Sequence, residues 1–106
     1  MDDGYYLIAL VSATGAACTA RVFVSDNQIV GQGISLSFYG YIHDSSIVLN
    51  VERNPGSRMN SILGEYYAYS FSGYLSQTPD GYFFETDAYT ELPVEITLKK
   101  VPEETA

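Results

Sequence analysis

The sequence contains no tryptophan, one cysteine and one histidine, and the shortage of cysteine and histidine argues against a metal site. With Cys18 alone, no disulfide can form within the chain, and a zinc site built on cysteines lacks its ligands. Small secreted domains usually carry several disulfides, so we expect a cytoplasmic protein. The chain opens with Met1-Asp-Asp-Gly rather than a basic segment, so we expect no signal peptide. The apolar stretch from Tyr5 to Val11 is shorter than the about 20 residues of a membrane-spanning helix.

Basic residues are also scarce. Lys and Arg number 5 against 13 Asp and Glu, which gives a formal net charge of −8 and an isoelectric point near 4.2. DNA, RNA and anionic membranes are bound by basic surfaces, so we expect none of them as a partner. The composition instead leaves a protein partner or a small molecule.

A helical repeat of useful length is missing as well, and apolar residues alternate with period two along most of the chain. With 106 residues, the chain is predicted to form one domain over 1–106. Turn residues such as Thr14-Gly15, Asp26-Asn27 and Pro79-Asp80-Gly81 separate the alternating runs. The predicted strands are 5–12, 17–25, 28–33, 35–42, 46–54, 66–75, 82–87 and 94–101.

Eight strands joined by short turns predict an antiparallel up-and-down β-barrel, because closure removes the two exposed edges of an open sheet. A two-sheet sandwich is the alternative. Gly40 and Gly73 interrupt the alternation of their strands, and we expect them to mark bends where the sheet curves.

The alternation also predicts which side chains face inward. Ile34, Leu36, Phe38 and Ile42 are expected on the core side of their strand. A small barrel either fills its interior with side chains or holds one ligand, so a carrier of a lipophilic molecule is the alternative function. The residues expected to line the interior are Leu36, Phe38, Tyr69, Phe71 and Phe84.

Three aromatic residues, Tyr66, Tyr74 and Phe83, stand at positions of the alternation that are not used by the inward-facing residues. We expect them on the outside of the barrel, where they form a dimer or partner face, or where tyrosine is simply tolerated on the surface of a sheet.

No arrangement of residues predicts catalysis. His43 and Asp44 adjoin in a hairpin turn, where no nucleophile accompanies them. Cys18 is expected to be a small buried hydrophobe, and Glu85 with Asp87 is expected to be a solvated strand face rather than a catalytic carboxylate pair. We therefore expect no enzyme, no cofactor and no metal.

The order of elements resembles the GrlR-like family, small bacterial proteins named for a negative regulator of type III secretion. The residues that carry the resemblance are Gly4-Tyr5-Tyr6, Asp26 to Gly33, Phe38-Tyr39-Gly40, Val51-Glu52-Arg53, Ser61-Ile62-Leu63 and Phe71-Ser72-Gly73. They span nearly the whole chain and are mostly structural glycines and hydrophobic residues. Gln32-Gly33 departs from the family, which has Gly-Asp at this bend.

The resemblance implies a barrel of lipocalin-like topology, a homodimer, and a role in sequestering a transcription activator without contacting DNA. It also implies that the hairpin turn of His43, Asp44, Ser45 and Ser46 binds the partner. In the regulator branch this turn is strongly acidic, whereas here it has one carboxylate, which leaves open a different partner or none.

Overall fold

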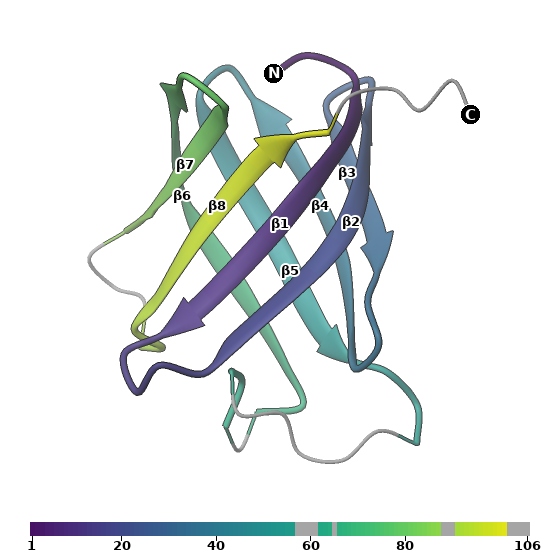
Figure 1. Cartoon of the computed structure of the whole chain (residues 1–106), viewed down its shortest axis with the longest axis vertical. Helices are drawn as coiled ribbons and strands as arrows, with labels where there is room; N and C mark the ends of the chain where they lie inside the picture. The colour runs from purple at the N-terminus through teal and green to yellow at the C-terminus, as the bar shows by residue number, and fades with distance from the viewer. Residues whose placement is uncertain (57–61, 65, 88–90, 102–106) are drawn as a thin grey trace.

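Eight antiparallel strands close into one barrel in the computed structural model, which describes residues 1–56, 62–64, 66–87 and 91–101 (Figure 1). Each strand pairs with the next along the chain, and β8 pairs with β1 to close the sheet. The predicted up-and-down β-barrel is therefore confirmed. The strands are β1 (Gly4–Ser12), β2 (Ala17–Ser25), β3 (Gln28–Gln32), β4 (Leu36–His43), β5 (Ser46–Arg53), β6 (Ala68–Thr78), β7 (Gly81–Thr86) and β8 (Val94–Lys100).

The alternation of the sequence becomes an alternation of burial. On β2, for example, Val22 and Val24 are buried inside the barrel, whereas Arg21 and Phe23 point outward. Inward side chains from all eight strands, together with Ile62 and Leu63 from the segment before β6, form one hydrophobic core. Burial of these side chains supplies the main driving force for closing the sheet.

Glycine is required at two inward positions because a neighbouring strand passes close to them. A β-carbon on Gly40 would collide with the carbonyl oxygen of Val48, and one on Gly73 would collide with the carbonyl oxygen of Glu85. Both residues are buried within their strands. The structure thus explains these two glycines by a close approach of backbones on the inside of the barrel, and the expected bends stay a prediction.

The prediction that Ile34 faces the core is wrong. The strand begins at Leu36, and Ile34 lies in the loop between β3 and β4 with its side chain 100% exposed. The alternation of Ile34, Leu36 and Phe38 starts before the first residue of β4. An alternating pattern does not show where the hydrogen bonds between neighbouring strands begin.

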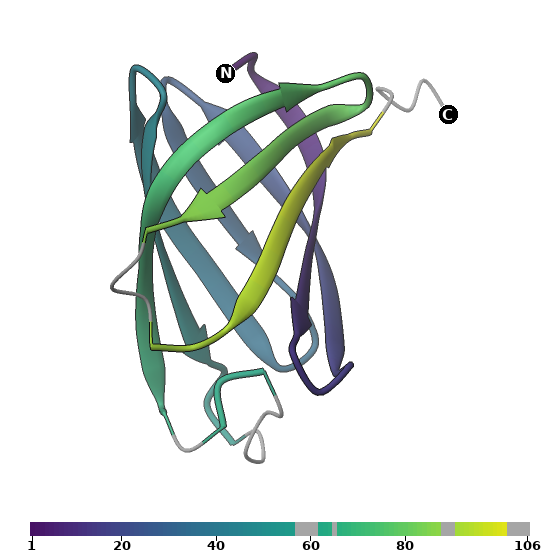
Figure 2. The same cartoon turned by 90° about the vertical axis from the view of Figure 1, so that its left-hand side faces the viewer.

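The up-and-down order places alternate connections at the same end of the barrel. The N-terminal residues 1–3 and the turns between β2 and β3, β4 and β5, and β6 and β7 all lie at the upper end in Figures 1 and 2, where β8 also ends. Within the described ranges, no helix is long and apolar enough to cross a membrane.

Candidate functional site

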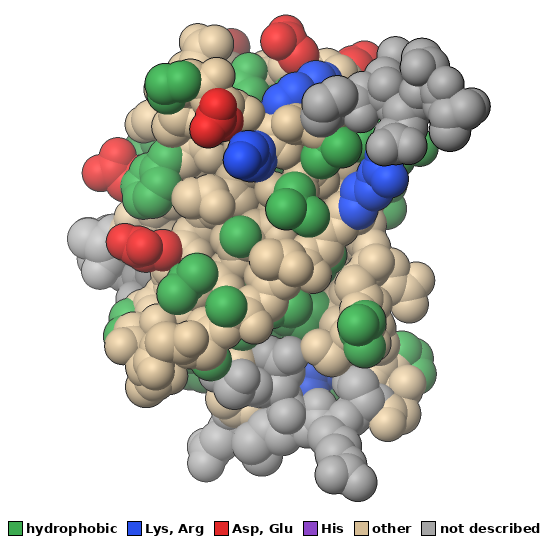
Figure 3. Space-filling view, in the orientation of Figure 1, with side chains coloured by type: hydrophobic (Ala, Val, Ile, Leu, Met, Phe, Trp, Pro, Cys, Tyr) green, Lys and Arg blue, Asp and Glu red, His purple; other side chains and the backbone are tan. Residues whose placement is uncertain are grey.

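An aspartate stands in each of the three turns at the upper end of the barrel, and two more precede β1 at the same end. All five aspartates are exposed. In Figure 3, Asp and Glu side chains gather along the upper and left-hand edges of the face that is shown. We call these residues the acidic rim: Asp2, Asp3, Asp26, Asp44 and Asp80.

Turn geometry explains why Asp and Asn occupy these positions. Asp26 and Asn27 have φ values of 53° and 61°, and Asp44 has a φ of 55°. Most side chains are disfavoured in this left-handed region, whereas Asp and Asn tolerate it. The tight turns thus place carboxylates at the tips of the hairpins.

The rim is held in place by the backbone of neighbouring strands. In three of the turns, a carbonyl oxygen accepts a backbone hydrogen bond of 2.8 Å from the next strand. No described Lys or Arg lies within ion-pair distance of Asp26, Asp44 or Asp80. The backbone of the turns is therefore held in position, and the carboxylates on the turns are exposed. The three bonds run to Asn27 from Ile42, to Ser45 from Leu75, and to Asp80 from Lys100.

The hairpin turn expected to bind a partner, His43 to Ser46, is part of this rim. It joins β4 to β5, and the side chains of His43 and Asp44 are 91% and 92% exposed. The Nε2 atom of His43 lies 3.7 Å from Oδ2 of Asp44. Such an open pair offers no shaped site for a substrate, so its chemistry suits contact with another molecule rather than catalysis.

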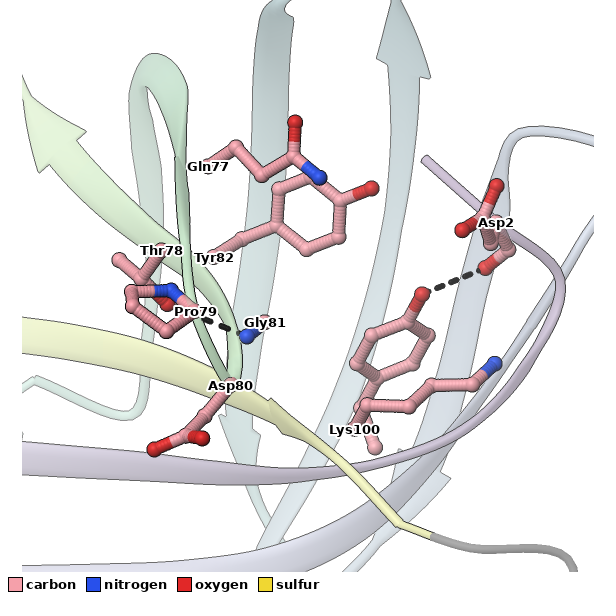
Figure 4. A pocket seen from close by; sticks show the side chains of 9 residues that line it. Asp2, Gln77, Thr78, Pro79, Asp80, Gly81, Tyr82 and Lys100 are labelled. Carbon is pink, nitrogen blue, oxygen red and sulfur yellow. Dashed lines mark hydrogen bonds between the residues drawn. The ribbon is translucent and has the colours of Figure 1, made fainter.

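A small cavity of about 180 Å³ opens at the same end (Figure 4). In the picture, Gln77 and Tyr82 lie on the side of β6 and β7, and Asp2 and Lys100 lie across the cavity from them. The amino group of Lys100 donates a hydrogen bond of 2.7 Å to the carbonyl oxygen of Asp3 and lies 4.7 Å from the centre of the Tyr6 ring. Ligand pockets commonly measure about 300–1,000 Å³, so this cavity suits no more than a very small molecule.

Tyr6 ties the N-terminal part of the rim to the core. Its side chain is buried, and its hydroxyl donates a hydrogen bond of 2.7 Å to the carbonyl oxygen of Asp2. Burial, with smaller contributions from Tyr82, Asp2 and Asp3, raises the pKa of Tyr6 from 10.0 to about 12. The hydroxyl therefore stays protonated and remains a donor at any physiological pH.

Two of the three residues expected to form an outer aromatic face come together. Tyr74 on β6 pairs with Glu85 and Phe83 on β7 pairs with Ser76, so both rings point outward two positions apart in the register. Tyr74 is 58% exposed, and Phe83 is half-buried.

Tyr66 lies apart from the other two residues, in the segment that precedes β6. Tyr74 lies six positions after Ala68 on β6, which is about 20 Å of extended strand. The Tyr66 hydroxyl donates a hydrogen bond of 2.8 Å to Oε2 of Glu91, and its ring meets the Tyr69 ring edge-on at 5.2 Å. Tyr66 therefore belongs to the lower end of the barrel.

The residues expected to line the interior lie inside the barrel. Leu36, Phe38, Phe71 and Phe84 are at most 1% exposed, and they pack within the continuous core. Tyr69 is partly buried against that core, and its hydroxyl accepts a hydrogen bond of 2.7 Å from the backbone of Glu91. The side chains fill the space that a lipophilic ligand would need.

A larger cavity of about 470 Å³ lies at the lower end, between the end of β7 and the start of β8. Residues 88–90, which connect β7 to β8 in the sequence, are outside the described part of the chain. None of the five residues expected to line the interior is among the described residues around it. Its described lining consists of Val11, Ser12, Ala13, Thr86, Pro93, Val94 and Glu95.

Cys18, expected to be a small buried hydrophobe, is partly buried and packs against the core. Burial raises the pKa of its thiol, which favours the unreactive protonated form. In the described part of the chain, no three His, Cys, Asp or Glu side chains gather as a metal site requires.

No protein-family model matches the chain, and no curated protein matches it either. The sequence pattern anticipated the turn at 43–46, but it did not anticipate that separate aspartates would gather into one rim. A signal was present: an Asp lies near the start of the chain and then in the turns after the second, fourth and sixth predicted strands.

Proposed function

We propose that the protein is a non-enzymatic protein-interaction module of the bacterial cytoplasm, similar to GrlR-like negative regulators. In this role it binds and sequesters a transcription activator of type III secretion. The observation that supports the proposal is the acidic rim, where fixed turns present Asp2, Asp3, Asp26, Asp44 and Asp80 at one end of the barrel.

A DNA-binding activator carries basic residues for its contacts with phosphate, and an acidic surface complements them. Binding of the rim to that basic surface would compete with DNA for the activator. The rim also compensates for the low acidity of the 43–46 turn, because the turn's single carboxylate acts together with those of neighbouring turns.

The test is direct binding between this protein and the purified transcription activators of type III secretion encoded in the source genome. A rim variant combines Asp26→Asn, Asp44→Asn and Asp80→Asn. The control combines Glu52→Gln, Glu85→Gln and Glu95→Gln, which are exposed carboxylates on the barrel wall. Each variant changes the formal charge from −8 to −5, since −8 + 3 = −5.

We expect the rim variant to weaken activator binding by about tenfold or more, and the control to change it by about twofold or less. An equal loss in both variants would mean that net charge alone governs binding, and it would remove the rim from the proposal. If no activator binds the wild-type protein in isothermal titration calorimetry, the proposed function fails.

A further inference from the structure

The small cavity at the upper end of the barrel carries two opposite charges that do not pair with each other. Asp2 supplies a carboxylate and Lys100 an ammonium, and both side chains line the cavity. Neither forms an ion pair with a described residue. In Figure 4 the two residues lie on the same side of the cavity, across from β6 and β7. The cavity therefore offers an anion and a cation that are both still open to a ligand.

The ammonium of Lys100 is held in place by its neighbours. It donates a hydrogen bond of 2.7 Å to the carbonyl oxygen of Asp3 and lies 4.7 Å from the centre of the Tyr6 ring. Gly4 leaves room for it, because a β-carbon at this position would collide with the Nζ atom of Lys100. The bond to Asp3 uses one of the three N–H groups of the ammonium. N–H groups thus remain for a carboxylate inside the cavity.

Neutral polar groups face this charged side from β6 and β7. In Figure 4 the amide of Gln77 and the hydroxyl of Tyr82 point toward Asp2. The carboxylate of Asp80 points away from them. No described residue forms a hydrogen bond with the amide of Gln77 or the hydroxyl of Tyr82. The rings of Tyr82 and the buried Tyr6 lie 6.1 Å apart, centre to centre, so the polar groups stand beside an aromatic wall.

We propose that this cavity binds a small free α-amino acid in its zwitterionic form. The carboxylate of the ligand contacts the ammonium of Lys100 and the hydroxyl of Tyr82, and the ammonium of the ligand contacts the carboxylate of Asp2. Asp2 and the other rim carboxylates repel a simple anion, and Lys100 repels a simple cation. A zwitterion meets an opposite charge at both of its ends, so the cavity selects it over either ion.

The volume of the cavity limits the size of the ligand. A water molecule takes about 30 Å³ of the liquid, so a cavity of about 180 Å³ holds about six groups of this size. Alanine fits this volume, whereas the aromatic amino acids exceed it. The cavity is open to solvent, and water competes for its polar groups, so we expect a dissociation constant on the order of 1 mM.

The test is an NMR titration of the ¹⁵N-labelled full chain with three ligands that differ in one charged group. L-Alanine carries both charges, propionate lacks the ammonium, and ethylamine lacks the carboxylate. We expect alanine to bind about tenfold or more tightly than either of the other two. The amide signals that shift should be those of residues 2–6, 77–82 and 99–101, which surround the cavity.

Three variants each remove one contact. Asp2→Asn should leave alanine binding no more tightly than propionate, because the ligand's ammonium loses its opposite charge. Lys100→Gln should leave alanine binding no more tightly than ethylamine, because the ligand's carboxylate loses its own. Tyr82→Phe removes only a hydroxyl and should weaken alanine binding by about threefold or more. The matched controls on the barrel wall, Glu52→Gln and Tyr39→Phe, should change it by less than about twofold.

The amide spectrum of each variant verifies that it is folded. Wild-type protein that binds alanine no more tightly than propionate and ethylamine overturns the proposal, and so do shifts that lie away from the cavity. Equal alanine binding by Tyr82→Phe and Tyr39→Phe overturns it as well, whatever Lys100→Gln does to folding. The proposal does not rest on activator binding at the rim, which is measured without amino acid, so the two can fail independently.

Discussion

The hydroxyl of Tyr6 is the polar end of an otherwise buried side chain, and its ionisation is coupled to folding. As the pH rises, the unfolded chain loses this proton near pH 10.0, whereas the folded protein holds it until about pH 12. The stabilisation from Tyr6 is therefore fully present below pH 10 and is lost as the pH rises toward 12. Tyr6→Phe should flatten this alkaline decline in the free energy of unfolding.

Chemical denaturation at a series of pH values measures the effect, with the exposed Tyr39→Phe as control. Below pH 9 we expect Tyr6→Phe to be less stable than wild type by about 1 kcal/mol, because the hydrogen bond to Asp2 is lost. If the decline between pH 10 and 12 is as steep in Tyr6→Phe as in wild type, another group causes it.

Asn54 joins two structural elements, the end of β5 and the loop between β3 and β4. Its amide Nδ2 donates to the carbonyl oxygens of Gly33 and Ile34 at 3.0 and 3.2 Å, and its backbone N donates to Ser35 at 2.9 Å. Its carbonyl Oδ1 accepts a hydrogen bond from Ser37. Because Asn54 is only 8% exposed, water cannot easily replace these bonds.

Asn54→Ala is expected to lower the free energy of unfolding by about 2–3 kcal/mol and to accelerate hydrogen exchange in residues 33–36. Asn50→Ala is the control, since Asn50 lies on β5 and its hydrogen bond with Ser70 is exposed. A loss of about 1 kcal/mol or less is expected there. Equal exchange of residues 33–36 in the two variants would show that Asn54 does not hold the loop.

At the level of elements, the sequence predicts most of the barrel because two independent signals coincide. The alternation of apolar residues ends at Asp26-Asn27 and at Asp44, and these residues also tolerate tight turns. Both signals therefore place hairpins at these positions, where the structure has them. Ile34 shows where this reasoning ends. Its strand-like alternation lies outside the sheet, and the two side-chain hydrogen bonds that Asn54 donates to the loop join residues 20 or more positions apart.

The acidic rim and the grouping of outward side chains differ in how far the sequence could reveal them. The acidic rim follows from the up-and-down order and the turn positions, both of which can be read from the sequence. The grouping of outward side chains follows from the register, which places Phe23 between Tyr5 and Val30 on adjacent strands. Turn positions approximate this register but do not show which outward side chains stand side by side. The sequence therefore grouped Tyr66 with Tyr74 and Phe83, although Tyr66 lies at the other end of β6.

The charge distribution over the whole molecule predicts how the proposed binding responds to salt. Binding of a basic activator at the rim depends on attraction between opposite charges, and screening weakens it. Raising NaCl from about 50 to about 500 mM should therefore raise the dissociation constant for the activator by about tenfold or more. Isothermal titration calorimetry at each salt concentration measures the effect. Binding that is equally tight at both concentrations would show that charge attraction to the rim does not hold the activator.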